Sequence, residues 1–244
     1  AKAFDVKFQN EKNEEKLVYA TSWGVSTRLV GALIMVHGDD KGLRLPPCVA
    51  PIQIVIIPII KDDADLEKIQ DYLKSFIIEL EEEKIRFQLD NRLKISPGFK
   101  FNEWEMKGVP IRVETGSRDM KSGTLLCVRR DTSEKQSFKI DSASAELNLL
   151  LDKIQGNMFN QALEFRDENT FTAESYDEFK SILDNGGFIR CGWDGNADSE
   201  AAIKFETKAT IRCILPETDS LTKEKRCIFS GKPAKYEVIY AKAY

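Results

Sequence analysis

The residues around Arg28 combine small side chains with one permanent positive charge. The segment Thr21–Arg28 reads TSWGVSTR and runs directly into the apolar stretch Leu29–Val36. A guanidinium is planar, always charged and able to hold an anion through two hydrogen bonds, so an arginine at a strand-to-helix junction suits a phosphate. Glycine and small hydroxyl residues let the backbone approach a ligand closely. The pattern predicts a phosphate site at Arg28. The alternative is a tight turn in front of a buried helix.

A second stretch carries a local excess of positive charge. Between Lys107 and Lys139 there are eight basic and four acidic residues, in a chain whose formal net charge is −4. RNA binding requires such a local patch when the whole chain is acidic. Arg112 and Glu114 alternate with the apolar side chains of one predicted strand. They are either ligand-binding residues or polar side chains on the wet face of that strand.

The hydrophobic pattern predicts the elements that carry these residues. Residues 52–60 form an apolar run that is too short to cross a membrane and is typical of a buried strand. Apolar positions then recur at helical spacing over residues 66–80, and further short strands follow. Residues 141–168 are predicted to form one long helix, with a small set of alternating helices and strands behind it. Strands that alternate with helices predict an α/β fold.

Composition limits the classes of protein further. The chain has 244 residues, of which 42% are hydrophobic and 31% are charged, as in ordinary soluble proteins. Five cysteines at scattered spacings favour a reducing compartment, and we expect a cytoplasmic protein without a membrane partner. His37 is the only histidine and invites an acid–base role. We interpret it as a structural or supporting residue.

The strongest signal comes from three segments read together. TSWGVSTR, GALIMVHGDDKGLRLPP and APIQIVIIPI resemble the third signature motif and the following sequence of class II prolyl-tRNA synthetases of the archaeal and eukaryotic type. The resemblance covers essentially the whole chain, but only the last half of such an enzyme. It implies that residues 1–47 end the antiparallel class II catalytic sheet, that 48–141 form a mixed-sheet α/β anticodon-binding domain, and that 142–244 form a linker helix and a small α/β C-terminal domain.

The resemblance also implies roles for single residues near the opening motif. Arg28 becomes a catalytic residue that binds the γ-phosphate of ATP, which would arrive with Mg²⁺. The nucleotide would also contact Ser26 and Thr27, and L-proline would contact Ser22, Trp23 and Gly24. The first two signature motifs are absent, so we expect this chain to be inactive without the missing catalytic half of the same enzyme.

The segment Gly108–Asp119 resembles the anticodon-reading strand and turn of these synthetases, which read two guanines of the proline anticodon. The Watson–Crick edge of guanine offers two donors that one carboxylate can accept, and its Hoogsteen edge offers two acceptors that arginine matches. We therefore expect base readers at Glu114, Arg118, Arg130 and Arg112.

The C-terminal part carries two further expectations. Many members of the family bind a structural zinc there through four cysteines, whereas this chain has only Cys191, Cys213 and Cys227 in that region and no CxxC pair. We therefore expect no zinc. The resemblance also implies that the carboxylate of Tyr244 returns to the catalytic site; the alternative is a disordered terminus.

The resemblance implies an enzyme that activates L-proline with ATP and transfers it to tRNA(Pro), with a homodimeric parent. Two alternatives belong to other classes. One is a stand-alone tRNA-binding module without catalysis, and the other is a structural or scaffolding module.

Overall fold

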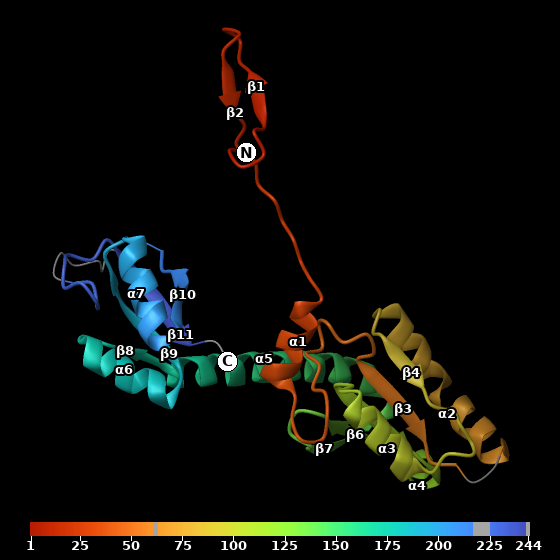
Figure 1. Cartoon of the computed structure of the whole chain (residues 1–244). Helices are drawn as coiled ribbons and strands as arrows, with labels where there is room; N and C mark the ends of the chain where they lie inside the picture. Colours follow the sequence, from red (N-terminus) through yellow and green to blue (C-terminus); the bar gives the residue numbers. More distant parts are fainter. Residues whose placement is uncertain (61–62, 217–224, 243–244) are drawn as a thin grey trace. The chain divides into compact units, whose positions relative to one another are not determined.

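The computed structural model describes residues 1–60, 63–216 and 225–242. The chain divides into two compact units, Ala1–Leu151 and Asp152–Tyr244, and the boundary falls inside the helix α5 (Ala143–Glu168) (Figure 1). The division expected from the sequence, with limits at residues 47 and 141, stays a prediction. The expected α/β class is confirmed, because both units combine helices with a sheet.

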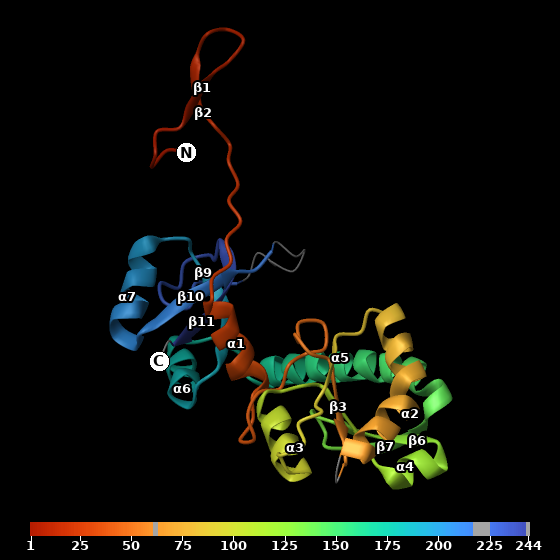
Figure 2. The same cartoon turned by 90° about the vertical axis from the view of Figure 1, so that its right-hand side faces the viewer.

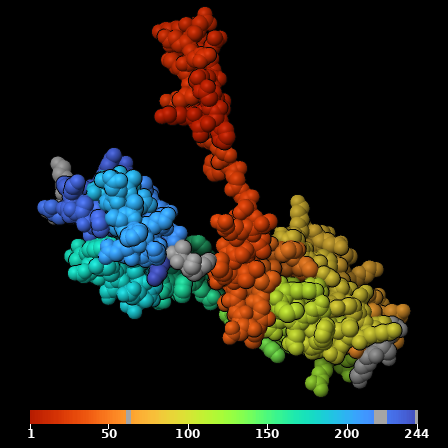
Figure 3. Space-filling view, in the orientation of Figure 1, coloured from red at the N-terminus to blue at the C-terminus, as the bar shows by residue number. Residues whose placement is uncertain are grey.

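The first unit begins with two short antiparallel strands, β1 (Lys7–Gln9) and β2 (Glu15–Leu17), whose residues are all exposed. Residues 18–26 have no regular structure, and most of their side chains are exposed (Figure 3). The helix α1 (Arg28–His37) follows where the apolar stretch predicts it, but it has no buried residue. An apolar helix face normally packs against a partner.

A five-stranded mixed sheet forms the centre of the first unit, with the strand order β4-β3-β5-β6-β7. The strand β3 pairs in parallel with both of its neighbours, and β5 and β6 continue the sheet in antiparallel pairs. Every residue of β3 is buried, as a continuous apolar run predicts. The strand bounds are β3 (Ile54–Pro58), β4 (Phe87–Leu89), β5 (Ile111–Thr115), β6 (Thr124–Arg129) and β7 (Lys135–Lys139).

Helices cover the two faces of this sheet. Figure 2 shows α2 (Asp63–Glu82) and α3 (Pro97–Met106) on opposite sides of β3. Because side chains alternate along a strand, Val55 and Ile57 face α3, where they pack with Trp104. The short helices α4 (Ser117–Ser122) and η1 (Ile140–Ser142) complete the unit.

The second unit is a four-stranded sheet with the order β10-β11-β9-β8. The strand β11 is antiparallel to both of its neighbours, and β8 is parallel to β9. Its core includes Phe179, Ile189, Val238 and Tyr240, none of which is exposed. The bounds are β8 (Thr170–Thr172), α6 (Tyr176–Asn185), β9 (Phe188–Trp193), α7 (Ala197–Thr207), β10 (Ala209–Ile214) and β11 (Tyr236–Lys242).

Within the three described ranges, no helix combines the length and the apolarity that a membrane crossing needs.

Candidate functional site

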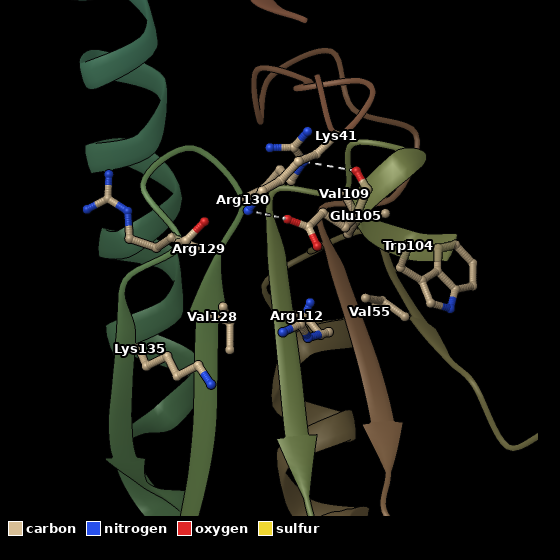
Figure 4. A pocket seen from close by; sticks show the side chains of 11 residues that line it. Lys41, Val55, Trp104, Glu105, Val109, Arg112, Val128, Arg129, Arg130 and Lys135 are labelled. Atoms are coloured by element: carbon tan, nitrogen blue, oxygen red, sulfur yellow. Dashed lines mark hydrogen bonds and ion pairs between the residues drawn. The ribbon is translucent and has the colours of Figure 1, made fainter. Parts of the chain in front are cut away.

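A cavity of about 180 Å³ opens on the face of the five-stranded sheet that α3 covers in part (Figure 4). Five basic side chains and one acidic side chain line it. The positive potential of the cavity favours an anionic ligand, and the one carboxylate can accept a hydrogen bond from a donor group of that ligand. The lining residues are Lys41, Val55, Trp104, Glu105, Val109, Arg112, Val128, Arg129, Arg130, Ser133 and Lys135.

Arg112 lies at the centre of this sheet and is held on two sides. It pairs with Val55 across the parallel ladder between β3 and β5, so its side chain rises on the same face. Its guanidinium lies over the ring of Phe101, 4.4 Å from the ring centroid, and its Nε donates to Glu114 Oε1 at 2.9 Å. The stacking and the ion pair together fix the arginine in one orientation.

Glu114 is two residues further along β5 and shares this face. It is only 7% exposed and does not line the cavity. One oxygen of its carboxylate accepts from Nε of Arg112 and lies 2.9 Å from Nη2 of the same guanidinium. The predicted base-reading carboxylate is thus paired with Arg112, and its role as a base reader stays a prediction.

Glu105 provides the carboxylate that does line the cavity. It belongs to the last turn of α3, whose first turn is fixed by Ser96 Oγ, which accepts from the backbone N of Phe99, and by Pro97. The Glu105 side chain is 23% exposed, and its Oε1 is 3.3 Å from Lys41 Nζ. Sequence reasoning missed this residue. The available signal was the short connection from α3 to β5, which places the end of the helix beside the start of the strand.

Arg130 follows β6 and is 8% exposed. Its two terminal nitrogens donate to the two carboxylate oxygens of Asp39 at 2.8 and 2.6 Å, and its Nε donates to the backbone oxygen of Glu105 at 2.9 Å. The Arg130 hydrogen bond is the largest of the influences that lower the pKa of Asp39 to about 2. Arg130, a predicted base reader, therefore links Asp39, which follows α1, to the end of α3 at one wall of the cavity.

Arg118 lies apart from the other predicted readers. It is exposed on α4 and does not line the cavity. The helix is fixed by the backbone N of Gly116, which donates to Asp119 Oδ2 at 2.9 Å. Of the predicted readers, Arg112 and Arg130 therefore line one cavity. Glu114 is buried beside Arg112 and does not line it, and Arg118 is exposed on α4.

The residues predicted to bind ATP and proline lie in the exposed segment before α1. Trp23 is 95% exposed, and Ser22, Gly24, Ser26 and Thr27 are exposed as well. Thr27 is in the N-cap position but makes no capping hydrogen bond with its side chain.

Arg28 is the exposed first residue of α1. At the other end of the helix, burial and then the charge of Arg44 lower the pKa of His37, which favours neutral imidazole. The supporting role expected for His37 stays a prediction. Tyr244 lies outside the described residues.

The three cysteines weighed as metal ligands do not converge. Cys191 and Cys227 are buried, and a backbone bridge joins Cys227 to the neighbour of Cys191, whereas Cys213 is exposed on β10. Burial, followed by the charge of Cys227, raises the pKa of the Cys191 thiol to about 12.

Asp194 lies near this pair and receives hydrogen bonds from two hydroxyls, Ser199 Oγ and Ser230 Oγ, each at 2.7 Å. Burial raises the pKa of Asp194, but these hydrogen bonds outweigh it and the pKa falls to about 2. Among the described residues, no group of three or more His, Cys, Asp or Glu side chains is arranged to hold a metal ion. The expected lack of zinc stays a prediction.

Comparisons with known proteins agree with this geometry. Residues 53–149, which contain the mixed sheet and most of the cavity, match the family model described as "Anticodon binding domain". The five-stranded sheet thus belongs to a domain of the anticodon-binding class. Residues 176–244 match "Prolyl-tRNA synthetase, C-terminal". The chain belongs to the prolyl-tRNA synthetase family and corresponds to its C-terminal part.

Similar proteins include three proline–tRNA ligases. The chain is 46% identical to that of Bacteroides fragilis over 246 residues, 48% to that of Azobacteroides pseudotrichonymphae over 250, and 47% to that of Prosthecochloris aestuarii over 250. Each alignment covers all of this chain and 50%, 49% and 51% of the respective relative, so the chain spans about half the length of these proteins. Because these relatives come from bacteria, they do not support the archaeal and eukaryotic type expected from the motifs.

Proposed function

We propose that the protein containing this chain activates L-proline with ATP and transfers it to tRNA(Pro), and that this chain supplies the anticodon recognition. The observation that carries the proposal is the basic cavity, which lies largely within the residues that match an anticodon-binding domain. It places one partly exposed carboxylate, Glu105, in a wall whose other charged side chains are all arginines and lysines. That is the chemistry needed to bind a splayed guanine beside its phosphates.

In this proposal Glu105 accepts hydrogen bonds from N1–H and N2–H₂ of a guanine, and Arg112 donates to the base or its sugar–phosphate. Glu114 takes the role of orienting Arg112, because its carboxylate is buried and lies outside the cavity. Arg130 holds the wall through Asp39, and Arg118 contacts the RNA backbone from α4. A bidentate contact to one base contributes about 1–3 kcal/mol of discrimination.

The test compares binding of two RNA hairpins. One is the anticodon stem–loop of tRNA(Pro), and the other is the same hairpin with inosine in place of the two anticodon guanines. Inosine lacks the N2 amino group, so it removes one of the two donors that Glu105 would accept. The unchanged chain should bind the guanine loop more tightly, and Glu105→Gln should bind both loops alike. Glu164→Gln on the exposed face of α5 is the matched control. Retained discrimination in Glu105→Gln would refute this role.

The synthetic step is assigned to the segment before α1. Arg28 would neutralise the γ-phosphate of ATP while pyrophosphate leaves, which is an electrostatic and positioning role. The nucleotide would also contact Ser26 and Thr27, and Mg²⁺ would accompany it; proline would contact Ser22, Trp23 and Gly24. Support comes from the high exposure of this segment and of the apolar residues of α1. Both would be covered by the rest of a catalytic domain.

In the longer protein, Arg28→Ala should abolish proline-dependent ATP–pyrophosphate exchange while leaving the binding of the anticodon stem–loop unchanged. Exchange at the parent rate would contradict the assignment. The same proposal includes a homodimeric parent, a cytoplasmic location and a return of the Tyr244 carboxylate to the catalytic site. A stand-alone tRNA-binding module is the second candidate, because the anticodon cavity is built entirely within this chain.

A further inference from the structure

One wall of the anticodon cavity comes from outside the domain that carries the match to anticodon-binding proteins. The turn Asp39–Gly42 follows α1 directly, and the matched residues begin only at position 53. Lys41 in this turn nevertheless lines the cavity together with Glu105 and Arg112. Figure 4 shows its ammonium close to the carboxylate of Glu105.

Two independent sets of contacts hold this turn in place. Asp39 binds Arg130 through both carboxylate oxygens, at 2.8 and 2.6 Å. On the other side, Gly42 has a φ of +127°, and a Cβ at this position would lie 2.7 Å from the Cα and the backbone oxygen of Met106. The next residue, Leu43, donates its N–H to that same oxygen at 2.9 Å. Only a residue without a side chain permits this approach.

The ion pair between Lys41 and Glu105 is a weak one. Its Nζ is 3.3 Å from Glu105 Oε1, and the Lys41 side chain is 60% exposed. Exposed pairs of this kind contribute little to stability, so the ammonium can exchange one anionic partner for another at little cost. In the proposed function a guanine binds at Glu105, and the RNA strand that carries it supplies phosphates as alternative anionic partners for Lys41.

We propose that Lys41 is a phosphate-binding residue of the anticodon site, and that the turn Asp39–Gly42 positions it there. Lys41 pairs with Glu105 in the structure, and its ammonium binds a phosphate of the RNA backbone instead when a base binds Glu105. This inference rests on the proposed function of the cavity. It adds to it a tRNA contact supplied by the segment that connects α1 to the anticodon-binding domain.

The experiment measures binding of the tRNA(Pro) anticodon stem–loop to the full chain at several salt concentrations. One phosphate contact on single-stranded RNA contributes about 0.7 to the slope of log affinity against log salt, which corresponds to about fivefold in affinity at 0.1 M salt. Lys41→Ala should lose about this much for the guanine loop and for the inosine loop alike. Lys41→Arg should retain the slope, and Lys74→Ala on the exposed face of α2 should match the unchanged chain.

Gly42→Ala tests the positioning without altering any charge. The added methyl group forces the turn away from Met106, so this variant should reproduce the reduced salt slope while its circular dichroism spectrum stays unchanged. Parent affinity and slope in Lys41→Ala would overturn the proposal, and so would a loss confined to the guanine loop, since a phosphate contact does not sense the base. Parent binding in Gly42→Ala would overturn the positioning role. If Glu105→Gln lost the discrimination between the guanine and inosine loops while Lys41→Ala bound with the parent affinity and salt slope, the role of Lys41 would be refuted and the proposed function of the cavity would stand.

Discussion

The buried carboxylate of Asp90 should be the most sensitive single position for the stability of the first unit. Asp90 directly follows β4, and its side chain is 1% exposed. It accepts from Arg92 Nε and Nη2 at 2.9 and 2.7 Å and from Trp104 Nε1 at 2.8 Å. Lys100, whose side chain is also 1% exposed, places its Nζ 3.5 Å from Asp90 Oδ1 and donates to the backbone oxygen of Asp90 at 3.0 Å.

Asp90→Asn removes the negative charge and leaves the buried ammonium of Lys100 with only a carbonyl. Breaking a buried pair by removing one partner costs about 3–5 kcal/mol. That is a large part of the 5–15 kcal/mol by which native proteins are typically stable. The measurement is urea unfolding at neutral pH, followed by tryptophan fluorescence, to which Trp104 contributes; its indole donates a hydrogen bond to Asp90.

The double variant Asp90→Asn/Lys100→Met provides the control. It removes the stranded charge as well, so it should recover about half of the lost free energy of unfolding, because a long apolar side chain replaces the ammonium. A loss below about 1 kcal/mol in Asp90→Asn would refute the reasoning. So would a double variant that is as unstable as the single one. Because α3 carries Trp104 and Glu105, the same loss should weaken RNA binding.

Three further predictions concern the second unit and the thiols. Glu237 accepts hydrogen bonds from Arg190 and Lys225. The Arg190 hydrogen bond is the largest of the effects that lower the pKa of Glu237 to about 2. The contribution of Glu237 to the free energy of unfolding is therefore complete above the unfolded pKa of about 4.3 and is lost as the pH falls toward 2. Glu237→Gln should therefore cost about 1–2 kcal/mol at pH 7, since both cations are partly exposed, and the difference from the parent in urea unfolding should shrink below pH 4. A difference that grew with acid would contradict the sign. Maleimide should label native protein only at the exposed thiols of Cys48 and Cys213; rapid labelling of the buried thiols would show an open core. Metal analysis should find well under one zinc per chain, and a stoichiometric amount that resists dialysis would overturn this.

Local patterns were sufficient for most of the secondary structure. The apolar run at β3, the helical spacing of apolar residues in α2 and the long series of such residues in α5 are each longer than the apolar patterns found in turns or loops. The helix α4 was expected only as a turn. It has six residues and no buried residue, so the sequence carries no apolar period there. It forms because Asp119 and a left-handed Gly123 cap its two ends.

The site was less predictable than the fold, because it depends on which segments meet. The charge excess between residues 107 and 139 includes Arg112 and Arg130, which both line the cavity, and their role as base readers stays a prediction. It could not show that Glu114 points behind Arg112, or that Glu105 from the preceding helix takes the exposed position. The partner of Arg130, Asp39, is 91 residues away in the sequence, and no local pattern joins them.

The clamp on Arg112 has a consequence for the cost of recognition. An arginine side chain on an open surface has many rotamers, and ordering one on binding costs about 0.5–1.5 kcal/mol. In this chain Phe101 and Glu114 already restrict the guanidinium before any ligand arrives. The entropy cost of ordering this side chain is therefore included in the free energy of folding and does not weaken binding. A preorganised arginine also cannot swing to suit a different base. In the proposed role, a wrong base would leave polar groups of the cavity desolvated and unmatched, and the rigidity of one side chain would become a source of selectivity.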